Sequence, residues 1–211
     1  SMKLFLLMLL LPFAHAETVP ELDPAAYAGR ECVNNHDENF CRVCNIFFEA
    51  GVEPYLGKVQ VGRVVEERIK RGNWGSSACQ VVWAREQFSW TFLDQSRRLP
   101  GPGNRNLIES VRAAAESQTL GGNGATHYYN PGLVAPVWGQ TCAKAAALYR
   151  QYTQQEIGHH IYLTCGPRVT IEAFAFFGER TMKQALEESM TSGSFLLHDE
   201  EGNVTGSALS P

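Results

Sequence analysis

Six cysteines constrain this chain more than any other feature, because each disulfide would tie two distant segments together. They are Cys32, Cys41, Cys44, Cys79, Cys142 and Cys165. An even number of cysteines is typical of an exported protein with structural disulfides, and six cysteines allow fifteen pairings. We expect up to three structural disulfides and predict Cys142–Cys165 as one of them.

Two other uses of the pair Cys41-x-x-Cys44 have to be weighed. A zinc site would need two further ligands at similarly close spacing, and none follows. A thioredoxin-like redox pair would need a β-α-β context, which the surrounding pattern lacks. The sequence therefore favours disulfides over metal or redox chemistry at this pair.

The N-terminus has the pattern of a secretory signal peptide over residues 1–16. A single Lys3 precedes the apolar run 4–13, and Ala14-His15-Ala16 forms an A-x-A cleavage site. The run is shorter than the roughly 20 residues of a normal membrane span. A short buried helix or an uncleaved anchor are the alternatives. We expect cleavage, a periplasmic or secreted protein, and no stable membrane insertion.

Composition narrows the class of protein. A length of 211 residues fits one domain with a small appendage. With 44% hydrophobic and 19% charged residues, the chain has the material for a core and differs from disordered proteins. The net charge of −4 argues against a phosphate-binding surface, so we expect no nucleic-acid partner.

Hydrophobic periodicity and capping residues predict a mainly helical α+β fold with a small β element. The expected parts are an irregular arm over 17–36, a helix from Glu38 capped by Asp37 and stopping by Gly51, a helix from Pro54 to Gly72, a looser aromatic segment over 73–93, a helix capped by Asn104 or Asn106, an alanine-rich helix over 141–153, a strand over 157–165, a strand or helix over 170–177, and a last helix over 180–192.

The second of these helices is expected to be amphipathic. Its apolar face is formed by Val61, Val64, Val65 and Ile69. Its solvent-facing side is expected to carry Glu66, Glu67, Arg68 and Lys70.

Glu49 is the strongest candidate for an acid catalyst. It falls in the last turn of the first helix, where the negative end of the helix dipole disfavours a carboxylate. Phe47 and Phe48 beside it would desolvate the carboxyl group, which also raises its pKa. A carboxylic acid that stays protonated near neutral pH is what glycosidic cleavage requires. The alternative is a solvated surface acid.

Other catalytic patterns are missing from the sequence. No G-x-S-x-G elbow and no H-E-x-x-H zinc motif occurs. The adjacent His159 and His160 would point in different directions in a helix or a strand. We therefore expect no metal and no cofactor. Aromatic rings that could stack on pyranose faces are Trp83, Trp90, Tyr128 and Tyr129.

Four stretches resemble the SleB-type cell wall hydrolase family, which includes the spore-cortex lytic enzymes. They occur in family order at residues 48–62 (FEAGVEPYLGKVQVG), 79–90 (CQVVWAREQFSW), 125–131 (ATHYYNP) and 158–162 (GHHIY). Two departures are Val52, where the family has glycine, and Glu67, where it has asparagine.

The resemblance implies a lysozyme-like, mainly helical α+β fold and a lytic transglycosylase. Such an enzyme cleaves the β-1,4 bond after N-acetylmuramic acid and leaves a 1,6-anhydro end. Glu49 would be the general acid and then the base. The expected substrate-binding residues are Gln87, Phe88, Ser89, Trp90, His127, Tyr128, Tyr129 and Asn130.

We therefore expect residues 37–165 to form the catalytic domain of a monomer that acts on peptidoglycan glycan strands, with 166–211 as an extension packed on the same domain. A zinc-dependent N-acetylmuramoyl-L-alanine amidase is the alternative enzyme. A non-catalytic peptidoglycan-binding protein is the alternative from another class.

Overall fold

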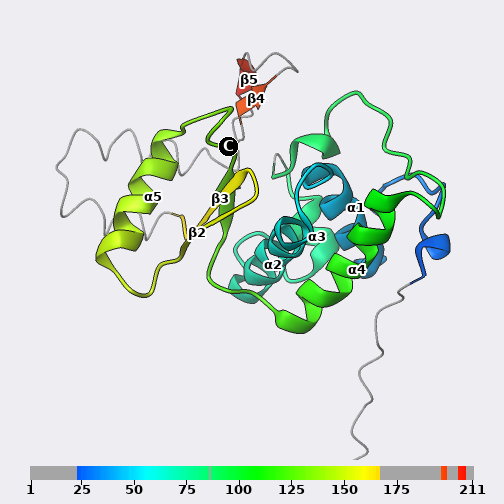
Figure 1. The fold of residues 1–211 in the computed structure, drawn as a ribbon, viewed down its shortest axis with the longest axis horizontal. Coiled ribbons are helices and arrows are strands. Elements are labelled where there is room, and N and C mark those ends of the chain that lie inside the picture. The colour runs from blue at the N-terminus through cyan, green and yellow to red at the C-terminus, as the bar shows by residue number, and fades with distance from the viewer. Residues whose placement is uncertain (1–22, 86, 167–195, 199–203, 208–211) are drawn as a thin grey trace, which may run out of the picture.

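The computed structural model describes residues 23–85, 87–166, 196–198 and 204–207 (Figure 1). The α-helices are α1 (Glu38–Glu49), α2 (Tyr55–Arg71), α3 (Ala78–Val82), α4 (Arg105–Leu120) and α5 (Val137–Leu148), with 3-10 turns at Pro24–Ala26 and Ser89–Thr91. The strands are β1 (His127–Tyr129), β2 (Gln154–Ile157), β3 (His160–Leu163), β4 (Leu196–His198) and β5 (Val204–Ser207). The predicted mainly helical α+β architecture is confirmed.

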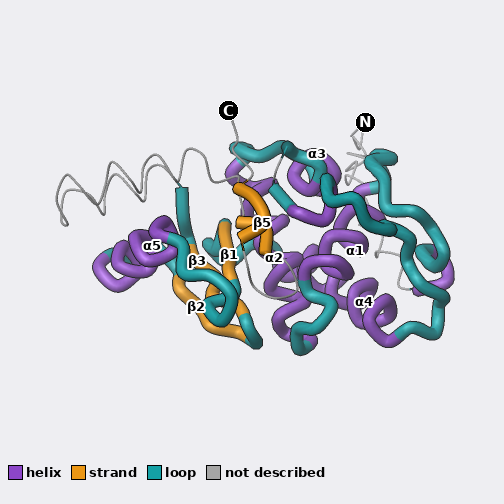
Figure 2. Tube along the Cα trace, turned by 90° about the horizontal axis from the view of Figure 1, so that it is seen from above, coloured by secondary structure: helices purple, strands orange, loops and turns teal. Residues whose placement is uncertain are grey.

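Apart from β4 and β5, which pair with each other, the described elements form two parts that lie side by side. Figures 1 and 2 both show α1, α2, α3 and α4 packed together, with the sheet of β1, β3 and β2 and the helix α5 on one side of them. Strand β3 is central and pairs antiparallel with β1 and with β2. The seam between the helices and the sheet positions the candidate site.

Local signals explain where three helices begin or end. The Asp37 carboxylate accepts the Phe40 N–H at 3.0 Å at the start of α1. The Asn104 side chain caps α4 by accepting the Leu107 N–H at 3.1 Å. Helix α2 ends at Gly72, which has φ +73°, a left-handed conformation that glycine adopts without strain. These three predictions are confirmed.

Helix α5 begins and ends earlier than the predicted range 141–153. Pro136 precedes its first turn in an extended conformation, and Tyr149 after Leu148 is also extended. Proline suits a helix start because its missing N–H is not needed there, whereas the alanine pattern alone marks no boundary.

The predicted single strand over 157–165 is a hairpin of β2 and β3, because Gly158 begins a two-residue turn with φ +61°.

All six cysteines form disulfides. The pairs are Cys32–Cys44, Cys41–Cys79 and Cys142–Cys165. The Cys142–Cys165 prediction is confirmed, and Cys41 and Cys44 belong to different bridges, as the disulfide interpretation requires. Two bridges hold α1 to the N-terminal arm and to α3, and the third holds α5 to the end of the sheet.

The four helices α1, α2, α3 and α4 share a hydrophobic core. Buried side chains of α1, α2, α3 and α4 pack together, among them Phe40, Ile46, Val61, Val65 and Leu107. Within the described segments no helix is long and apolar enough to cross a bilayer. The predicted signal peptide, the predicted elements over 170–177 and 180–192, and most of the predicted extension lie outside the described residues.

Candidate active site

Glu49 is the last residue of α1 and faces the sheet across the seam. Its Oε2 accepts a hydrogen bond of 2.8 Å from the hydroxyl of Tyr128, on β1. Tyr128 is 2% exposed, whereas Glu49 keeps partial contact with solvent. The fold therefore brings together two predicted site residues that lie 79 positions apart in the sequence.

The environment of Glu49 brings the pKa of its carboxyl group close to neutral pH. Burial raises the pKa of Glu49 from 4.5 to about 7, against the opposing effects of the Tyr128 hydrogen bond and the Arg68 charge. Phe47 and Phe48 pack against the core beside it, as predicted. A carboxyl group with a pKa near 7 is able both to give and to take a proton at physiological pH.

Arg68 is a fixed cation below the site. It is fully buried on α2, and its Nε donates to the Thr126 carbonyl at 2.8 Å. Its guanidinium lies 5.0 Å from the ring centroid of Trp74 and 5.2 Å from that of Phe88, within cation–π range. Burial lowers the pKa of Arg68 to about 10, so the side chain remains charged at neutral pH.

The solvent-facing placement of Arg68 and Glu67 was wrong. Both are buried, at 0% and 3% exposure. Glu67 accepts the Gly124 N–H at 3.1 Å and pairs with Arg71 at 2.8 Å, so its charge is compensated. Val61, Val65 and Arg68 follow the spacing i, i+4, i+7, which places Arg68 on the buried face, and this spacing was the sequence signal for its burial.

Lys58 anchors the turn that follows Glu49. Lys58 is a buried residue of α2. Its Nζ donates to the carbonyls of Ala50 and Gly51 at 2.8 and 3.0 Å and to Oδ1 of Asn106 at 2.9 Å. A cation suits a helix C-terminus, where carbonyls lack helical partners. Sequence analysis did not identify this residue, because an isolated lysine in a helix is normally solvated.

The predicted substrate-binding residues divide by exposure. Phe88 and Trp90 are 0% and 2% exposed and form part of the core, where Trp90 stacks on Phe48 at 5.0 Å. Their rings are covered by neighbouring side chains, so they support the site from beneath and present no surface for stacking on a sugar. We therefore assign them a supporting role.

Gln87 and His127 are also buried. Gln87 accepts a hydrogen bond of 3.3 Å from Arg68, and the His127 ring lies between Trp74 and Trp138. Ser89, Tyr129 and Asn130 are half-buried and reach solvent. These three keep the exposure that a substrate contact needs.

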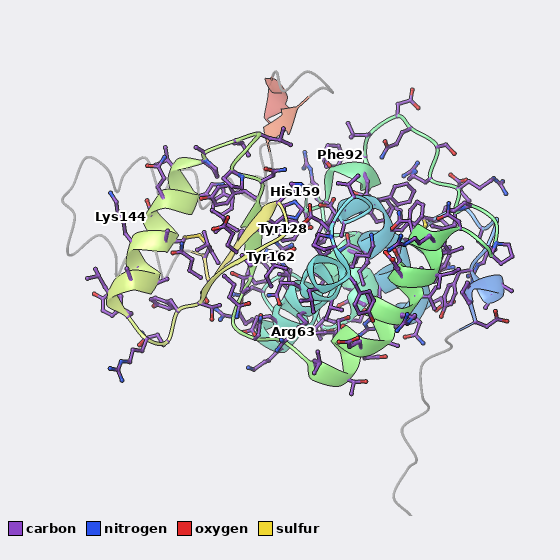
Figure 3. The ribbon with its side chains drawn as sticks, in the orientation of Figure 1. Arg63, Phe92, Tyr128, Lys144, His159 and Tyr162 are labelled. Carbon is purple, nitrogen blue, oxygen red and sulfur yellow. A yellow bond between two sulfur atoms is a disulfide. The ribbon has the colours of Figure 1, made fainter. Side chains whose placement is uncertain are left out.

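The β2–β3 hairpin joins the site through a carboxylate that sequence analysis passed over. Glu53, in the turn before α2, accepts the backbone N–H of His159 at 2.9 Å. The hydroxyl of Tyr162 donates to the Gly57 carbonyl at 3.2 Å. Figure 3 shows Tyr128, His159 and Tyr162 gathered where the sheet meets the helices. No group of three or more potential metal ligands occurs among the described residues.

Replacing Tyr128 with phenylalanine tests its control of the acid. The hydroxyl stabilises the carboxylate form, so its removal is expected to raise the pKa of Glu49 and to move the basic limb of the pH–rate profile toward higher pH. Loss of this positioning bond is expected to lower the rate roughly tenfold. Initial rates on cell walls between pH 4 and 9 measure both effects.

Tyr55→Phe is the matched control for this substitution. Its hydroxyl also donates to a carboxylate, that of Glu116 at 2.7 Å, but on a different part of the surface. We expect the profile of this variant to equal that of the wild type. A basic limb that stays in place in Tyr128→Phe would contradict the assigned hydrogen bond.

Comparisons with known proteins place the chain in a family. The Cell Wall Hydrolase family profile matches residues 52–163, beginning three residues after Glu49. The SleB catalytic domain of Bacillus anthracis, described as a germination-specific lytic transglycosylase, is 20% identical, with 64% of this chain and 99% of that chain covered and a TM-score of 0.43. The Bacillus cereus SleB catalytic domain is 21% identical, with 65% and 99% covered and a TM-score of 0.45.

No curated protein matches the sequence significantly. The family profile nevertheless spans more than half of the 211 residues, and it includes Arg68, Tyr128 and the β2–β3 hairpin. The resemblance predicted from the four motifs is confirmed: the chain belongs to the Cell Wall Hydrolase family.

Proposed function

We propose that this cell wall hydrolase cleaves the glycan strands of peptidoglycan as a lytic transglycosylase, with Glu49 as its general acid and base. The observation that carries the proposal is the Glu49 carboxyl group, whose pKa of about 7 and bond to Tyr128 suit it to both proton transfers. The motif around Glu49 supports the same assignment.

In the first step, protonated Glu49 donates its proton to the oxygen that links N-acetylmuramic acid to the next sugar. The bond from this oxygen to C1 of the muramoyl residue breaks, and positive charge develops at C1. The neighbouring 2-acetamido group stabilises this oxocarbenium-like state. General acid catalysis of this kind accelerates a reaction by about 10²- to 10⁴-fold.

In the second step, the Glu49 carboxylate accepts the proton of the muramoyl C6 hydroxyl while O6 bonds to C1. The product is a 1,6-anhydro end, no water is consumed, and Glu49 is protonated again. The Tyr128 hydroxyl and the Arg68 charge both stabilise the carboxylate between the two steps. The groups that lower the Glu49 pKa thus stabilise the carboxylate at the stage of the reaction in which Glu49 is ionised.

A second catalytic carboxylate is not needed for this route, since the attacking group belongs to the substrate. Glu53 is the next carboxylate along the chain, but its side chain is 1% exposed and engaged by the His159 N–H. Its burial supports a mechanism that depends on Glu49 alone. We further propose that Ser89, Tyr129 and Asn130 contact the saccharide.

Three disulfides support a protein that works in an oxidising compartment, which agrees with a periplasmic or secreted enzyme acting on the cell wall as a monomer. The signal peptide over residues 1–16 and its cleavage remain part of this proposal.

Mass spectrometry of the fragments released from purified sacculi tests the reaction. We expect muropeptides ending in 1,6-anhydro-N-acetylmuramic acid, which are lighter by one water than hydrolytic products. Reducing ends would contradict the internal attack by C6, and free stem peptides would indicate an amidase instead. A digest with Glu49→Gln serves as the control for contaminating activities.

A further inference from the structure

The β2–β3 hairpin is attached to the helices through one buried carboxylate. Glu53 Oε2 accepts the His159 N–H at 2.9 Å, and Oε1 lies 3.0 Å from the His159 Nδ1. A Cβ at Gly158 would collide with this carboxylate and with Pro54, so only glycine allows the turn to approach so closely. The turn that follows Glu49 along the chain therefore sets the position of the hairpin.

His160 is the hairpin residue that faces the site. Its ring packs edge-on against Tyr128 at 5.1 Å between centroids and against Tyr162 at 5.9 Å. Since Tyr128 donates to Glu49, one side chain separates the imidazole from the proposed acid. His160 is therefore placed to meet a substrate bound at Glu49.

The two edges of the imidazole have different surroundings. Nδ1 is buried, has no hydrogen-bond partner among the residues that the structure describes, and lies 3.6 Å from Oε1 of Glu53. The side chain keeps 13% of its surface exposed, and Nδ1 contributes almost none of it. Unlike Nδ1, Nε2 is not among the buried side-chain nitrogens that lack a partner in the described part of the chain, so Nε2 is the ring nitrogen that a ligand can reach.

We propose that Glu53 holds His160 as the Nδ1–H tautomer, so that Nε2 accepts a hydrogen bond from a hydroxyl or amide N–H of the glycan beside Glu49. This inference rests on the proposed function and adds a substrate-binding residue, His160, and a positioning residue, Glu53. Neither was among the residues predicted from the sequence.

Electrostatics select this tautomer. A carboxylate attracts an N–H that is directed at it and repels a lone pair in the same position, so Glu53 favours the proton on Nδ1. In a neutral imidazole the other nitrogen, Nε2, then carries the lone pair and acts as an acceptor. The charged or titratable groups facing the ring are Glu53, His159, Tyr128 and Tyr162. Burial lowers the pKa of His160, outweighing the Glu53 charge, so the neutral ring prevails at neutral pH.

Paired alanine substitutions separate binding from mere proximity to Glu53. His159→Ala is the matched control, because His159 contacts the same carboxylate but its side chain is 64% exposed and its backbone N–H remains. We expect His160→Ala to lower the initial rate on dilute sacculi roughly tenfold or more, the effect of losing one hydrogen bond to substrate. We expect His159→Ala to stay within about twofold, as for an exposed side chain. Equal losses in the two variants would overturn the proposal.

Nitrogen-15 NMR of the imidazole rings tests the tautomer without any reaction. In the wild-type protein at pH 7 we expect the His160 signals of the Nδ1–H form. Glu53→Gln removes the charge and is expected to shift the ring toward the Nε2–H form, with a raised KM for glycan. A wild-type Nε2–H signal would overturn the proposal even if that variant failed to fold. The tautomer does not depend on product chemistry, so this result is separate from the test for anhydro ends.

Discussion

Replacing Glu49 with glutamine is expected to abolish the release of soluble fragments from sacculi. Glutamine keeps an oxygen that accepts the Tyr128 hydrogen bond, but it has no proton to donate and none to recover. The loss should reach at least the 10²- to 10⁴-fold contribution of a general acid. Turbidity of a sacculus suspension, followed over hours, measures it.

The matched control for activity is Glu156→Gln. Glu156 is an exposed carboxylate on β2, and we expect its substitution to leave the rate unchanged. Fragment release by Glu49→Gln at a rate close to that of the wild type would eliminate Glu49 as the acid and the proposed mechanism with it.

The same substitution has a stability effect whose sign follows from the raised pKa. Because the folded pKa of about 7 exceeds the unfolded value near 4.5, the folded wild-type protein loses stability as pH rises through this window. Glutamine carries no such cost, so Glu49→Gln should be more stable than wild type at pH 8 by about 1–3 kcal/mol. At pH 4 the two proteins should unfold alike. Thermal melts at both pH values check this, and equal melts at pH 8 would contradict the desolvation of Glu49.

Replacing Lys58 with methionine is expected to produce the largest loss of stability. Methionine fills the same space, but it removes the charged donor that the Ala50 and Gly51 carbonyls and the Asn106 side-chain oxygen share. Removing one partner from a buried charged network costs about 3–5 kcal/mol. Denaturant unfolding at pH 7 measures the change in the free energy of unfolding.

Activity should fall as well in Lys58→Met, at temperatures where the variant is still folded, because the turn after Glu49 loses its anchor. Lys70→Met is the matched control: Lys70 lies on the same helix, 72% exposed and 3.8 Å from Glu67. We expect this control to change stability by less than about 0.5 kcal/mol, as for an exposed ion pair. Similar losses in both variants would mean that the Lys58 contacts do not stabilise the fold.

Sequence reasoning succeeded where the signal is local. The caps at Asp37 and Asn104, the stop at Gly72 and the position of Glu49 at a helix end each depend on a few neighbouring residues. Sequence reasoning was less successful with long side chains that have two possible environments. Arg68 and Lys58 are as compatible with solvent as with a buried network. Only the hydrogen-bond acceptors around them in the folded structure show that both are buried.

The aromatic residues show the same limit. Phe88 and Trp90 lie in a motif that resembles a substrate-binding stretch, but packing places them under the site, since a ring that covers Arg68 or stacks on Phe48 cannot also face a sugar. The solvent exposure of an aromatic side chain depends on which surfaces pack together in the fold, and the sequence alone does not reveal this. Glu53 and His160 were passed over for a similar reason, because they meet only when the hairpin docks.

The sequence by itself determined the helical content and the family, and it predicted Glu49 as the acid, because periodicity, capping chemistry and a short motif are properties of adjacent residues. Only the tertiary structure decided what raises the pKa of that acid, which hydroxyl holds it and which charges are buried beneath it. Desolvation and hydrogen bonding act through space over a few ångströms, and the groups concerned come from α1, α2 and β1, up to 79 residues apart along the chain.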